Sequence, residues 1–476
     1  MILFDLIVSN PPFEDSVKRK KTPHKLWIDF THKEISLLSE NGELAQISPN
    51  SFLSPSSKIL PYFTKYVVKN LNLDTGSYFD VGSTFADYNI IKRENNGNKT
   101  VVIDQGSQVD YFNFSNNLQY IPNDFCATAI SIHTKVIFNS KNKLNVKYDY
   151  VTCHNVQLKD DNSPISKTQN TIFKYPIFHT NPQIWYSKVK QDFADKKKVM
   201  WTRSGYTKPF YDDGKLGGTD MAYYVLVSSE EEGNNLVNNL NTQLFEYIFA
   251  TARWSGFGNE LVFKSIPDLP KDKTLSDQEM FALFNLTDKE IEYVNNYKKK
   301  NKKEQKESTD GGKVRDKDRV KVTAEVFTSN ELADRLISQC EEKWFTDSNV
   351  KILEPSAGNG QLVMAILRKM KSLGRNDWEH ILSNQLFIVE YMEDNILDMI
   401  NKISQFTGLS LNNISHNIVF ADFLYFTDNN ILTEEMWKSN RYLQGKSLRI
   451  QPSEKNAKVE DLPKTNTFDT LFIQEV

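Results

Sequence analysis

The amino-acid sequence predicts an α/β protein with parallel-sheet segments near both ends and a mixed, strand-rich region between them. Two observations predict this class. Residues 4–55 read strand, helix, strand, and the chain returns to strand–helix alternation after residue 323. Strands that alternate with helices form parallel sheets, because each helix carries the chain back across the sheet.

The first strand is expected over residues 4–9, where FDLIVS is apolar and β-branched. Pro11 and Pro12 then end the pairing, because neither has an N–H to donate to a neighbouring strand. Asn10 is therefore expected in a stiff loop at the carboxyl end of a strand, where open α/β sheets bind ligands. A strand followed by an ordinary proline turn explains the same residues, through Phe13, equally well.

The next segments are expected to complete this half and open a different region. Residues 25–40 carry apolar side chains at mainly helical spacing, and residues 41–54 predict a turn, a short strand and a polar loop. From about residue 80 to 270, short runs such as NIIKRE, TVVID, ATAISIH and YYVLVSS predict a separate, mixed, strand-rich region. Residues 274–297 predict two short helices.

A polar linker is expected before the last part of the chain. Residues 298–320 are almost all polar, with a basic run and a Gly-Gly pair, so they cannot bury a core. A solvated tether without a DNA role is the better interpretation of the basic run. An amphipathic helix is expected next, and Thr328 and Glu331 have the spacing of a capping box.

A glycine loop follows the next expected strand. The strand VKIL, residues 350–353, leads into the loop from Glu354 to Gly360, and a helix follows directly. Gly358 and Gly360 let the backbone turn sharply and come close to a ligand. The N-terminus of the following helix offers free N–H groups.

Two further acids end the strands that come after this loop. Glu390 ends the strand in NQLFIVE, where an acid commonly holds the ribose hydroxyls of a nucleoside cofactor. Asp422 ends the third strand, within reach of an adenine amino group. Either acid alone is better explained as a helix cap or a solvated loop residue. The three features together, in sequence order, nevertheless indicate a nucleoside-cofactor site.

The composition is that of an ordinary globular protein, with 476 residues, 39% hydrophobic and 25% charged, and a net charge of −3. Two or three domains are expected, and contact with nucleic acid must come from local basic patches. Cys126, Cys153 and Cys340 form no CxxC pair, so neither disulfides nor a metal site is expected. Without a signal peptide or an apolar run of ~18 residues, a soluble, cytoplasmic protein of a bacterium or a virus-infected cell is expected.

Together these segments resemble the amino-group DNA methyltransferases that use S-adenosylmethionine. SNPPF resembles the catalytic motif of that family, LEPSAGNGQ its cofactor loop, IVEYMEDN its ribose-binding acid and VFADFLYF its adenine-contacting strand end. EVFTSNELADRLI resembles the helix that closes over the methionine moiety. The resemblance is close over residues 4–55 and 323–425. The residues that it assigns to the cofactor are Phe327, Thr328, Glu354, Ser356, Ala357, Gly358, Gly360, Glu390, Asp422 and Phe423.

The resemblance implies a Rossmann-like methyltransferase sheet assembled from both ends of the chain, with an inserted mixed α+β target-recognition region. It also implies a circular permutation, since the catalytic motif leads and the cofactor half comes last. A sheet tolerates this order because the two strands are spatial neighbours either way. The expected divisions are a catalytic half at 1–80, a recognition region at 81–297, a linker at 298–320 and a cofactor-binding half at 321–476.

In this family, asparagine before Pro-Pro and phenylalanine after it favour adenine N6 over cytosine N4. The side-chain oxygen of Asn10 and the carbonyl of Pro11 are then expected to accept the two N–H bonds of the amine and stabilise its positive charge. Pro11 and Pro12 hold these acceptors rigidly, and Phe13 stacks on the base. The target must leave the duplex to reach such a pocket, so base flipping is implied.

Two basic stretches are candidates for contact with duplex DNA. One follows the catalytic loop, where phosphate contacts and a solvated loop are equally good explanations. The other, residues 200–220, interleaves aromatic and basic side chains, which suits groove contact or base capture although the aromatics could equally form a core. The candidates are Lys18, Arg19, Lys20, Lys21, Arg203, Tyr206 and Lys208.

Several alternatives stay open. NPPF-type loops also serve protein-glutamine and RNA methyltransferases, although those enzymes usually lack so long an insert. A catalytically inactive DNA-specificity subunit is a further interpretation, against which the intact asparagine and cofactor acids argue. A cognate restriction or partner subunit is left open, although the sequence shows no nuclease carboxylate cluster.

The last nine residues, FDTLFIQEV, begin like the first strand but stop before any Asn-Pro-Pro. Residues 468–476 therefore resemble the remnant of a trimmed tandem duplication, and two segments would compete for one strand position beside VKIL. We expect residues 4–9 to take that central position and the tail to be displaced. The alternative is a split enzyme in which the tail fills the position.

Overall fold

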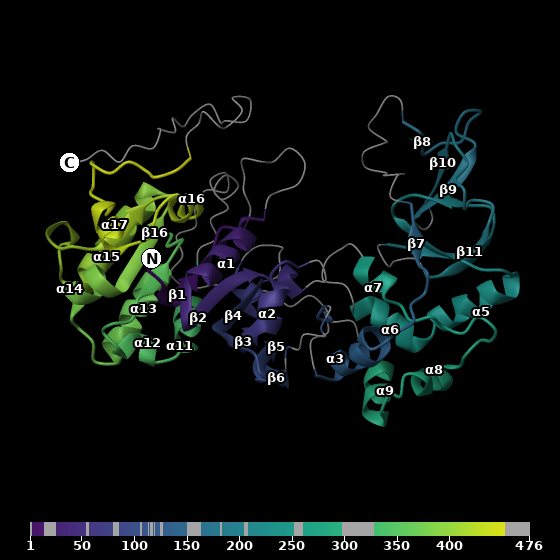
Figure 1. Ribbon diagram of the computed structural model, residues 1–476, viewed down its shortest axis with the longest axis horizontal. Coiled ribbons are helices and arrows are strands. Elements are labelled where there is room, and N and C mark those ends of the chain that lie inside the picture. Colours follow the sequence, from purple (N-terminus) through teal and green to yellow (C-terminus); the bar gives the residue numbers. More distant parts are fainter. Residues whose placement is uncertain are drawn as a thin grey trace. The chain divides into compact units, whose positions relative to one another are not determined.

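The computed structural model describes residues 2–13, 25–53, 57–79, 85–104, 107–112, 114, 118, 120–123, 127–149, 163–180, 183–203, 208–251, 260–297 and 328–452. Contacts divide the chain into two compact units (Figure 1). Unit 1 comprises Met1–Asn50, Pro61–Asn116 and Lys303–Val476. Unit 2 comprises Ser51–Leu60 and Asn117–Lys302.

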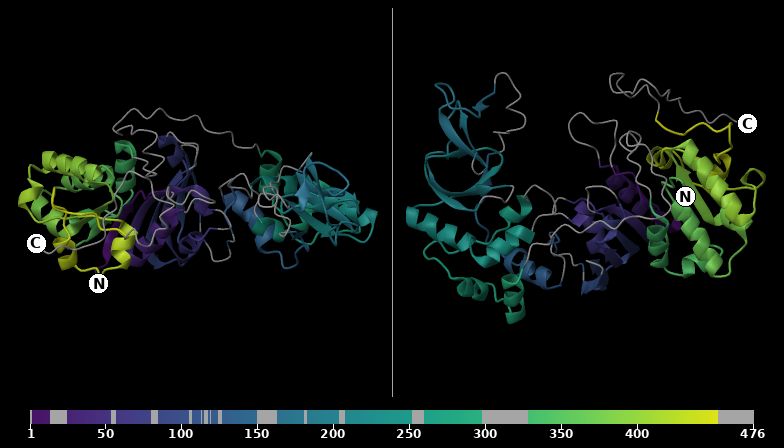
Figure 2. Two further views of the ribbon diagram at one scale, coloured as in Figure 1. Left: turned by 90° about the horizontal axis from the view of Figure 1, so that it is seen from above. Right: turned by 180° about the vertical axis from the view of Figure 1, so that it is seen from behind.

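Within the described residues, unit 1 contains a nine-stranded sheet built from both ends of the chain (Figure 2). In spatial order the strands are β17 (Asn417–Phe420), β16 (Leu386–Glu390), β15 (Ile352–Glu354), β1 (Phe4–Ser9), β2 (Leu38–Pro49), β4 (Phe85–Glu94), β3 (Tyr66–Asn72), β5 (Thr100–Asp104) and β6 (Ser107–Phe112). The strands from β17 to β2 run parallel. Strand β4 is antiparallel to β2 and β3, β3 and β5 are parallel, and β6 is antiparallel to β5.

Strand β1 lies inside the parallel array, between β15 and β2, where the purple N-terminal ribbon borders green elements (Figure 1). Leu6 pairs with Ile352 of β15 on one side, and β1 pairs in parallel with β2 on the other. The expectation that residues 4–9 take the central strand position is therefore confirmed. The tail, residues 468–476, lies outside the described residues.

Helices cover both faces of these parallel strands. On one face, α11, α12, α13 and α15 share a core with the strands that includes Leu6, Leu336 and Val363. On the other face, Phe4 meets Phe387 edge-on at 5.4 Å between ring centroids, and Trp437 of α17 packs against both rings. The helices of unit 1 are α1 (Leu26–Leu37), α2 (Leu60–Lys65), α11 (Asn330–Ser338), α12 (Lys343–Thr346), α13 (Gln361–Ser372), α14 (Trp378–His380), α15 (Glu393–Thr407), α16 (Phe423–Asp428) and α17 (Glu434–Ser439), with short turns η1 (Asn50–Leu53), η2 (Thr75–Tyr78), η4 (Ile381–Gln385) and η5 (Leu411–Asn413).

Two features of unit 1 differ from the sequence-based expectation. Helix α1 ends at Leu37 rather than at residue 40, because Leu38 already has an extended backbone and starts β2. The runs NIIKRE and TVVID belong to β4 and β5 of this sheet and not to a separate region. The sheet thus extends to Phe112, past the division expected at residue 80.

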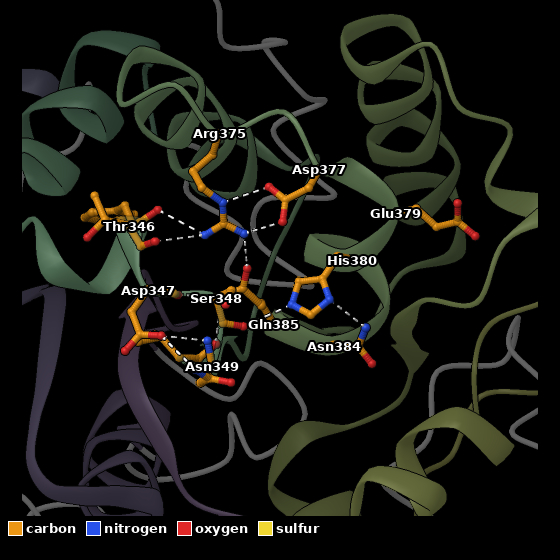
Figure 3. A network of polar contacts seen from close by, with 12 residues as sticks. Thr346, Asp347, Ser348, Asn349, Arg375, Asp377, Glu379, His380, Asn384 and Gln385 are labelled. Carbon is orange, nitrogen blue, oxygen red and sulfur yellow. Dashed lines mark hydrogen bonds and ion pairs between the residues drawn. The ribbon is translucent and has the colours of Figure 1, made fainter.

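A polar network fixes the chain where β15 and β16 begin (Figure 3). Arg375 donates to the two carboxylate oxygens of Asp377, at 2.7 Å each, and to Gln385 Oε1 at 2.6 Å. Gln385 Nε2 in turn donates to the carbonyls of Asp347 and Val350. Because Val350 precedes β15 and Gln385 precedes β16, these bonds hold the starts of both strands together.

Unit 2, within its described residues, has two four-stranded sheets and a group of helices. One sheet contains β13 (Gly217–Gly218), β9 (Tyr175–Thr180), β10 (Gln183–Ser187) and β8 (Ile165–Ser166). The other contains β12 (Phe210–Asp213), β11 (Lys197–Thr202), β14 (Ala222–Leu226) and β7 (Lys147–Tyr148). The helices are α3 (Ala127–His133), η3 (Thr134–Phe138), α5 (Glu230–Leu240), α6 (Gln243–Thr251), α7 (Glu260–Lys264), α8 (Asp277–Leu283) and α9 (Asp288–Asn295).

Two sequence-based expectations for unit 2 have different outcomes. The run ATAISIH was expected as a strand but forms α3, since so short an apolar run fits a helical period as well as an alternating one. The two short helices expected in residues 274–297 are confirmed as α8 and α9. Each begins with a capping box, from Ser276 and Thr287 respectively.

Candidate cofactor and catalytic site

The NPPF loop, residues 10–13, leaves the middle of the sheet at the carboxyl end of β1. Asn10 Nδ2 donates to Thr328 Oγ1 at 3.0 Å, and the carbonyl of Asn10 accepts from Ser356 Oγ at 3.2 Å. Thr328 lies 318 positions further along the chain and Ser356 lies 346 positions further. The two ends of the chain therefore meet at this loop.

Aromatic rings line one side of the NPPF loop. Pro11 is buried and Pro12 half-buried, as the stiff turn requires. The half-buried ring of Phe13 packs against Phe85 of β4 with 4.8 Å between centroids, and Phe85 packs against Phe79 at 4.9 Å. The loop is thus anchored to the hydrophobic core through Phe13.

Thr328 has a different role from the expected cap. The residue that caps α11 is Ser329, whose Oγ accepts from the N–H of Leu332 at 3.2 Å. The capping box expected between Thr328 and Glu331 therefore does not form. The buried hydroxyl of Thr328 accepts from Asn10 instead, which connects α11 directly to the NPPF loop.

The glycine loop begins at Glu354, the last residue of β15, whose side chain is fully buried. Glu354 Oε1 accepts from the N–H of Ser356 at 3.0 Å. Its Oε2 is buried and has no hydrogen-bond partner among the residues that the structure describes. Burial, with Glu390 and Glu34 nearby, raises the pKa of Glu354 well above its usual range. One oxygen of this carboxyl group is therefore left for a ligand.

The glycines give the loop a backbone that other residues rarely adopt. Gly358 and Gly360 have positive φ angles of 52° and 88°. A Cβ on Gly360 would come within 2.6 Å of Met399 Cγ, so the loop packs closely on α15. The N–H of Ala357 donates to the carbonyl of Val389 at 3.1 Å, which fixes the loop against β16.

Glu390 ends β16, as expected, and its carboxylate faces the glycine loop. Oε2 accepts from the N–H of Gly358 at 2.7 Å. Oε1 accepts from the N–H of Met392 at 2.8 Å and from Asn395 Nδ2 at 3.1 Å. Three donors hold this carboxylate in one orientation beside the loop.

Asp422 follows β17 and caps α16. Its Oδ1 accepts from the N–H of Tyr425 at 3.2 Å, and its own N–H donates to the carbonyl of Ile450 at 2.7 Å. Asp422 therefore caps α16 through Oδ1, as the helix-cap interpretation of this residue expects. Phe423 is buried, and its ring packs on Phe30 of α1 with 5.1 Å between centroids.

The four strand ends therefore place the expected site residues along one edge of the sheet, because parallel strands present their carboxyl ends on the same side. Asn10 is joined to Ser356, and Gly358 to Glu390, by hydrogen bonds. The side chains are rich in oxygen acceptors, which complement a ligand that carries ammonium, hydroxyl and amino donors. Phe327 lies outside the described residues.

Sequence reasoning missed Glu34, a fully buried acid on α1. Ser9, the residue before Asn10, donates to Glu34 Oε1 at 2.6 Å, and Gln46 Nε2 of β2 donates to Oε2 at 2.5 Å. Burial raises the pKa of Glu34 to about 8, although the Ser9 hydrogen bond opposes the shift. The available signal was an acid on the apolar face of the helix that carries Phe30.

The DNA-contact candidates described by the structure all belong to unit 2. Trp201, beside them in sequence, is a buried core residue. The Arg203 guanidinium lies 5.9 Å from the centroid of the Tyr148 ring, and exposed Lys208 forms an ion pair with Glu246. The remaining candidates, Lys18, Arg19, Lys20, Lys21 and Tyr206, lie outside the described residues.

Two further features concern the part of the chain that the structure describes. None of its helices is both long and apolar enough to cross a lipid bilayer. Among the same residues, His, Cys, Asp and Glu side chains form no group of three or more that could hold a metal ion.

The fold and the site define an α/β protein in which polar residues from both ends of the chain meet at one edge of the sheet. Residues 2–85, which contain β1, the NPPF loop and β2, match the family described as Eco57I restriction-modification methylase. The sequence matches none of the curated proteins.

Similar solved structures include the Type IIL restriction-modification enzyme MmeI in complex with DNA, at 10% identity and a TM-score of 0.33 over 59% of this chain and 48% of that one. The ATP-dependent Type ISP restriction-modification enzyme LlaBIII bound to DNA has 11% identity and a TM-score of 0.29 over 60% and 28%. The type IIG restriction endonuclease BpuSI has 8% identity and a TM-score of 0.22 over 59% and 45%. The chain thus spans less than half the length of each.

Proposed function

We propose that this chain is an S-adenosylmethionine-dependent DNA methyltransferase that methylates adenine at N6. The observation that carries the proposal is the contact of the NPPF loop with the glycine loop, through Ser356 and the Asn10 carbonyl. Methyl transfer to an amine requires hydrogen-bond acceptors for the amine beside the loop that binds the methyl donor. The match of residues 2–85 to a restriction-modification methylase family supports the same conclusion.

The residues at the strand ends fit S-adenosylmethionine, which carries an ammonium group, two ribose hydroxyls and an adenine amine as donors. The buried Glu354 Oε2 suits the ammonium group, Glu390 the ribose and Asp422 the amine. Thr328, Ala357 and the glycine loop complete the proposed site together with Phe423. When bound, the cofactor supplies a methyl group on positively charged sulfur.

The strand arrangement supports a permuted Rossmann-like sheet. The strand that carries the NPPF loop lies next to the strand that carries the glycine loop, although the former comes first in sequence. Moving residues 2–112 behind residue 452 would give the order cofactor half, catalytic half without altering the parallel pairing of β1 and β15. The intervening unit 2 is then the proposed target-recognition region for duplex DNA.

In this proposal the NPPF loop binds the exocyclic amine. Asn10 Oδ1 and the Pro11 carbonyl accept its two N–H bonds and stabilise the positive charge that develops on nitrogen. Thr328 and Ser356 hold Asn10 by its side chain and its carbonyl, so the acceptors are fixed before the substrate arrives. Phe13 stacks on the flipped base.

The test is methyl transfer from labelled S-adenosylmethionine to unmethylated duplex DNA, with the modified nucleoside identified by mass spectrometry. Asn10→Ala should lower the rate on the order of 100-fold or more, because a transition-state acceptor is lost. Its cofactor affinity, measured by calorimetry, should change only a few-fold, and exposed Asn413→Ala should behave as wild type. Near-wild-type activity of Asn10→Ala, or label only in cytosine, RNA or protein, would contradict the proposal.

A further inference from the structure

We propose that Glu34 is a positioning residue whose carboxyl group ties the end of β1 to α1 and β2 and so holds the NPPF loop for methyl transfer. The inference rests on the proposed function, because the position of Asn10 matters only if Asn10 binds the reacting amine. It concerns a residue that lies behind the loop and does not contact the substrate.

The tie acts one residue away from the proposed acceptor. Ser9 is the last residue of β1, and Asn10 follows it directly. Ser9 and Glu34 are both fully buried, and Ser9 Oγ lies 2.6 Å from Glu34 Oε1. A shift of this pair would therefore be transmitted to Asn10 through a single peptide unit.

The other side of the carboxyl group is fixed as firmly. Gln46 Nε2 lies 2.5 Å from Glu34 Oε2, while Gln46 Oε1 accepts from Thr31 Oγ1 at 2.9 Å and from the hydroxyl of Tyr88. Because Gln46 Oε1 accepts from the Tyr88 hydroxyl, the amide group of Gln46 meets Glu34 with its N–H. Helix α1 and strands β1, β2 and β4 thus meet at one buried carboxyl group.

The surroundings favour the neutral carboxyl group. The titratable side chains that face Glu34 from neighbouring elements are Tyr88 on β4 and Glu354 at the end of β15, and neither supplies a positive charge. On α1 itself, Lys33 pairs with Asp428 and His32 with Tyr62. Burial raises the pKa of Glu34 to about 8, so the group is neutral at neutral pH and ionises in mildly alkaline solution.

Ionisation would disturb the loop. A buried negative charge without a cationic partner must draw in water or shift its neighbours, and Ser9 is the neighbour attached to Asn10. A displacement of about 1 Å at a reacting centre can lower a rate about 100-fold. Methyl transfer should therefore slow as the pH rises through about 8.

The experiment compares kcat for methyl transfer from about pH 6 to about pH 10 in wild type, E34Q and S9A. Wild type should lose activity about 10-fold per pH unit above the Glu34 pKa. E34Q should not show this fall, because its amide cannot ionise. The amide still mimics the neutral acid: its oxygen can accept from Gln46, and its NH₂ can donate to Ser9 Oγ when the Ser9 hydroxyl turns from donor to acceptor, as it also does toward a protonated Oε1.

S9A removes the tie itself, so kcat should fall about 10-fold or more at every pH while KM for S-adenosylmethionine stays unchanged. Glu43→Gln is the matched control: Glu43 is as deeply buried in β2, but its carboxylate binds Lys69 and Trp344. This control should keep the alkaline fall of the wild type.

An alkaline fall in E34Q that equals that of wild type, or an unchanged kcat in S9A, would overturn this inference and leave the proposed function intact. Wild-type protein that transfers no methyl group to DNA at any pH would overturn both. A loss of the fall in E34Q together with a kcat-only defect in S9A supports the inference.

Discussion

Two regions were predicted from the sequence to be functional. One is the set of carboxyl ends of β1, β15 and β16 in unit 1, and the other is the aromatic, basic stretch at residues 200–220 in unit 2. In the structure, only the residues of the first region lie together. The strand ends lie together, with Asn10 bonded to Ser356 and Gly358 bonded to Glu390. The stretch is divided, with Trp201 in the core and Lys208 exposed.

The two regions differ because the two sequence patterns restrict different properties of the residues. A residue that ends a strand of a parallel sheet must lie on one particular edge, so sequence position determines location. Alternating aromatic and basic residues constrain composition but not direction, because an aromatic ring is as suitable for a core as for a base. Topological signals are therefore the better guide to a site.

The largest expected effect concerns the stretch in unit 2. Trp201→Ala should lower the free energy of unfolding of unit 2 by about 3–5 kcal/mol, because a large buried side chain is deleted from the core. Chemical unfolding followed by circular dichroism measures this. Trp378→Ala, at a half-buried position in unit 1, should leave the unit 2 transition unchanged. A stable Trp201→Ala protein with weakened DNA binding would reverse the contrast.

The next effect is a pH dependence of the free energy of unfolding, caused by Glu34, which lies beside the end of β1. The pKa of Glu34 is raised from 4.5 to about 8, so between these values the folded protein binds a proton that the unfolded chain releases. The stabilisation is complete below about pH 4.5 and is lost as the pH rises to about 8, up to about 5 kcal/mol.

The measurement is the difference in unfolding free energy between wild type and E34Q across this pH range. Asp87, whose pKa burial raises to about 6, is present in both proteins and cancels. A difference that is constant with pH would show that Glu34 titrates normally in the folded protein.

A smaller effect distinguishes two glycines with similar backbones. Gly360 and Gly374 have φ angles of 88° and 83°, but only a Cβ at Gly360 would meet a neighbour, Met399. Gly360→Ala should therefore weaken S-adenosylmethionine binding about 10-fold, whereas Gly374→Ala carries only the backbone strain of about 1–2 kcal/mol. Calorimetric titration of both variants decides, and equal cofactor affinities would argue against the assigned glycine loop.

The smallest effect is expected at the surface of unit 2. Lys208→Gln should change stability by less than about 0.5 kcal/mol, because its ion pair with Glu246 is solvent-exposed. If Lys208 contacts a phosphate, the variant should also lower the slope of log affinity against log salt by about 0.9. Filter binding at several salt concentrations measures this slope, and an unchanged slope would remove Lys208 from the DNA-contact candidates.

Much of the parallel part of unit 1 follows from local sequence. Strand β1, the glycine loop and the position of Glu390 at a strand end were all predicted, because each depends on a short apolar run and the residue that ends it. The membership of β4 and β5 in the same sheet was not predicted. Which strands pair depends on partners far away in the chain, and alternation alone does not identify them.

The finer contacts of the site depend on tertiary structure even more. Nothing local indicates that Thr328 would bond to Asn10 rather than cap α11, since Ser329 offers an equally good cap. Glu34 could be recognised only as an acid on an apolar helix face, and its partners Ser9 and Gln46 come from two other elements. Sequence therefore predicts the edge of the sheet but not the hydrogen bonds that support it.

The central position of β1 has a consequence for biosynthesis. Asp5 accepts a hydrogen bond from the N–H of Lys351, 346 positions later. At roughly 5–20 residues per second, a ribosome needs roughly 20–70 s to travel that far. During this time the nascent β1 has no β15 to pair with, and its apolar FDLIVS edge is open to chaperones or to aggregation. Unit 2, by contrast, comprises Ser51–Leu60 and Asn117–Lys302, so all of it has been synthesised while the last third of the chain is still being translated.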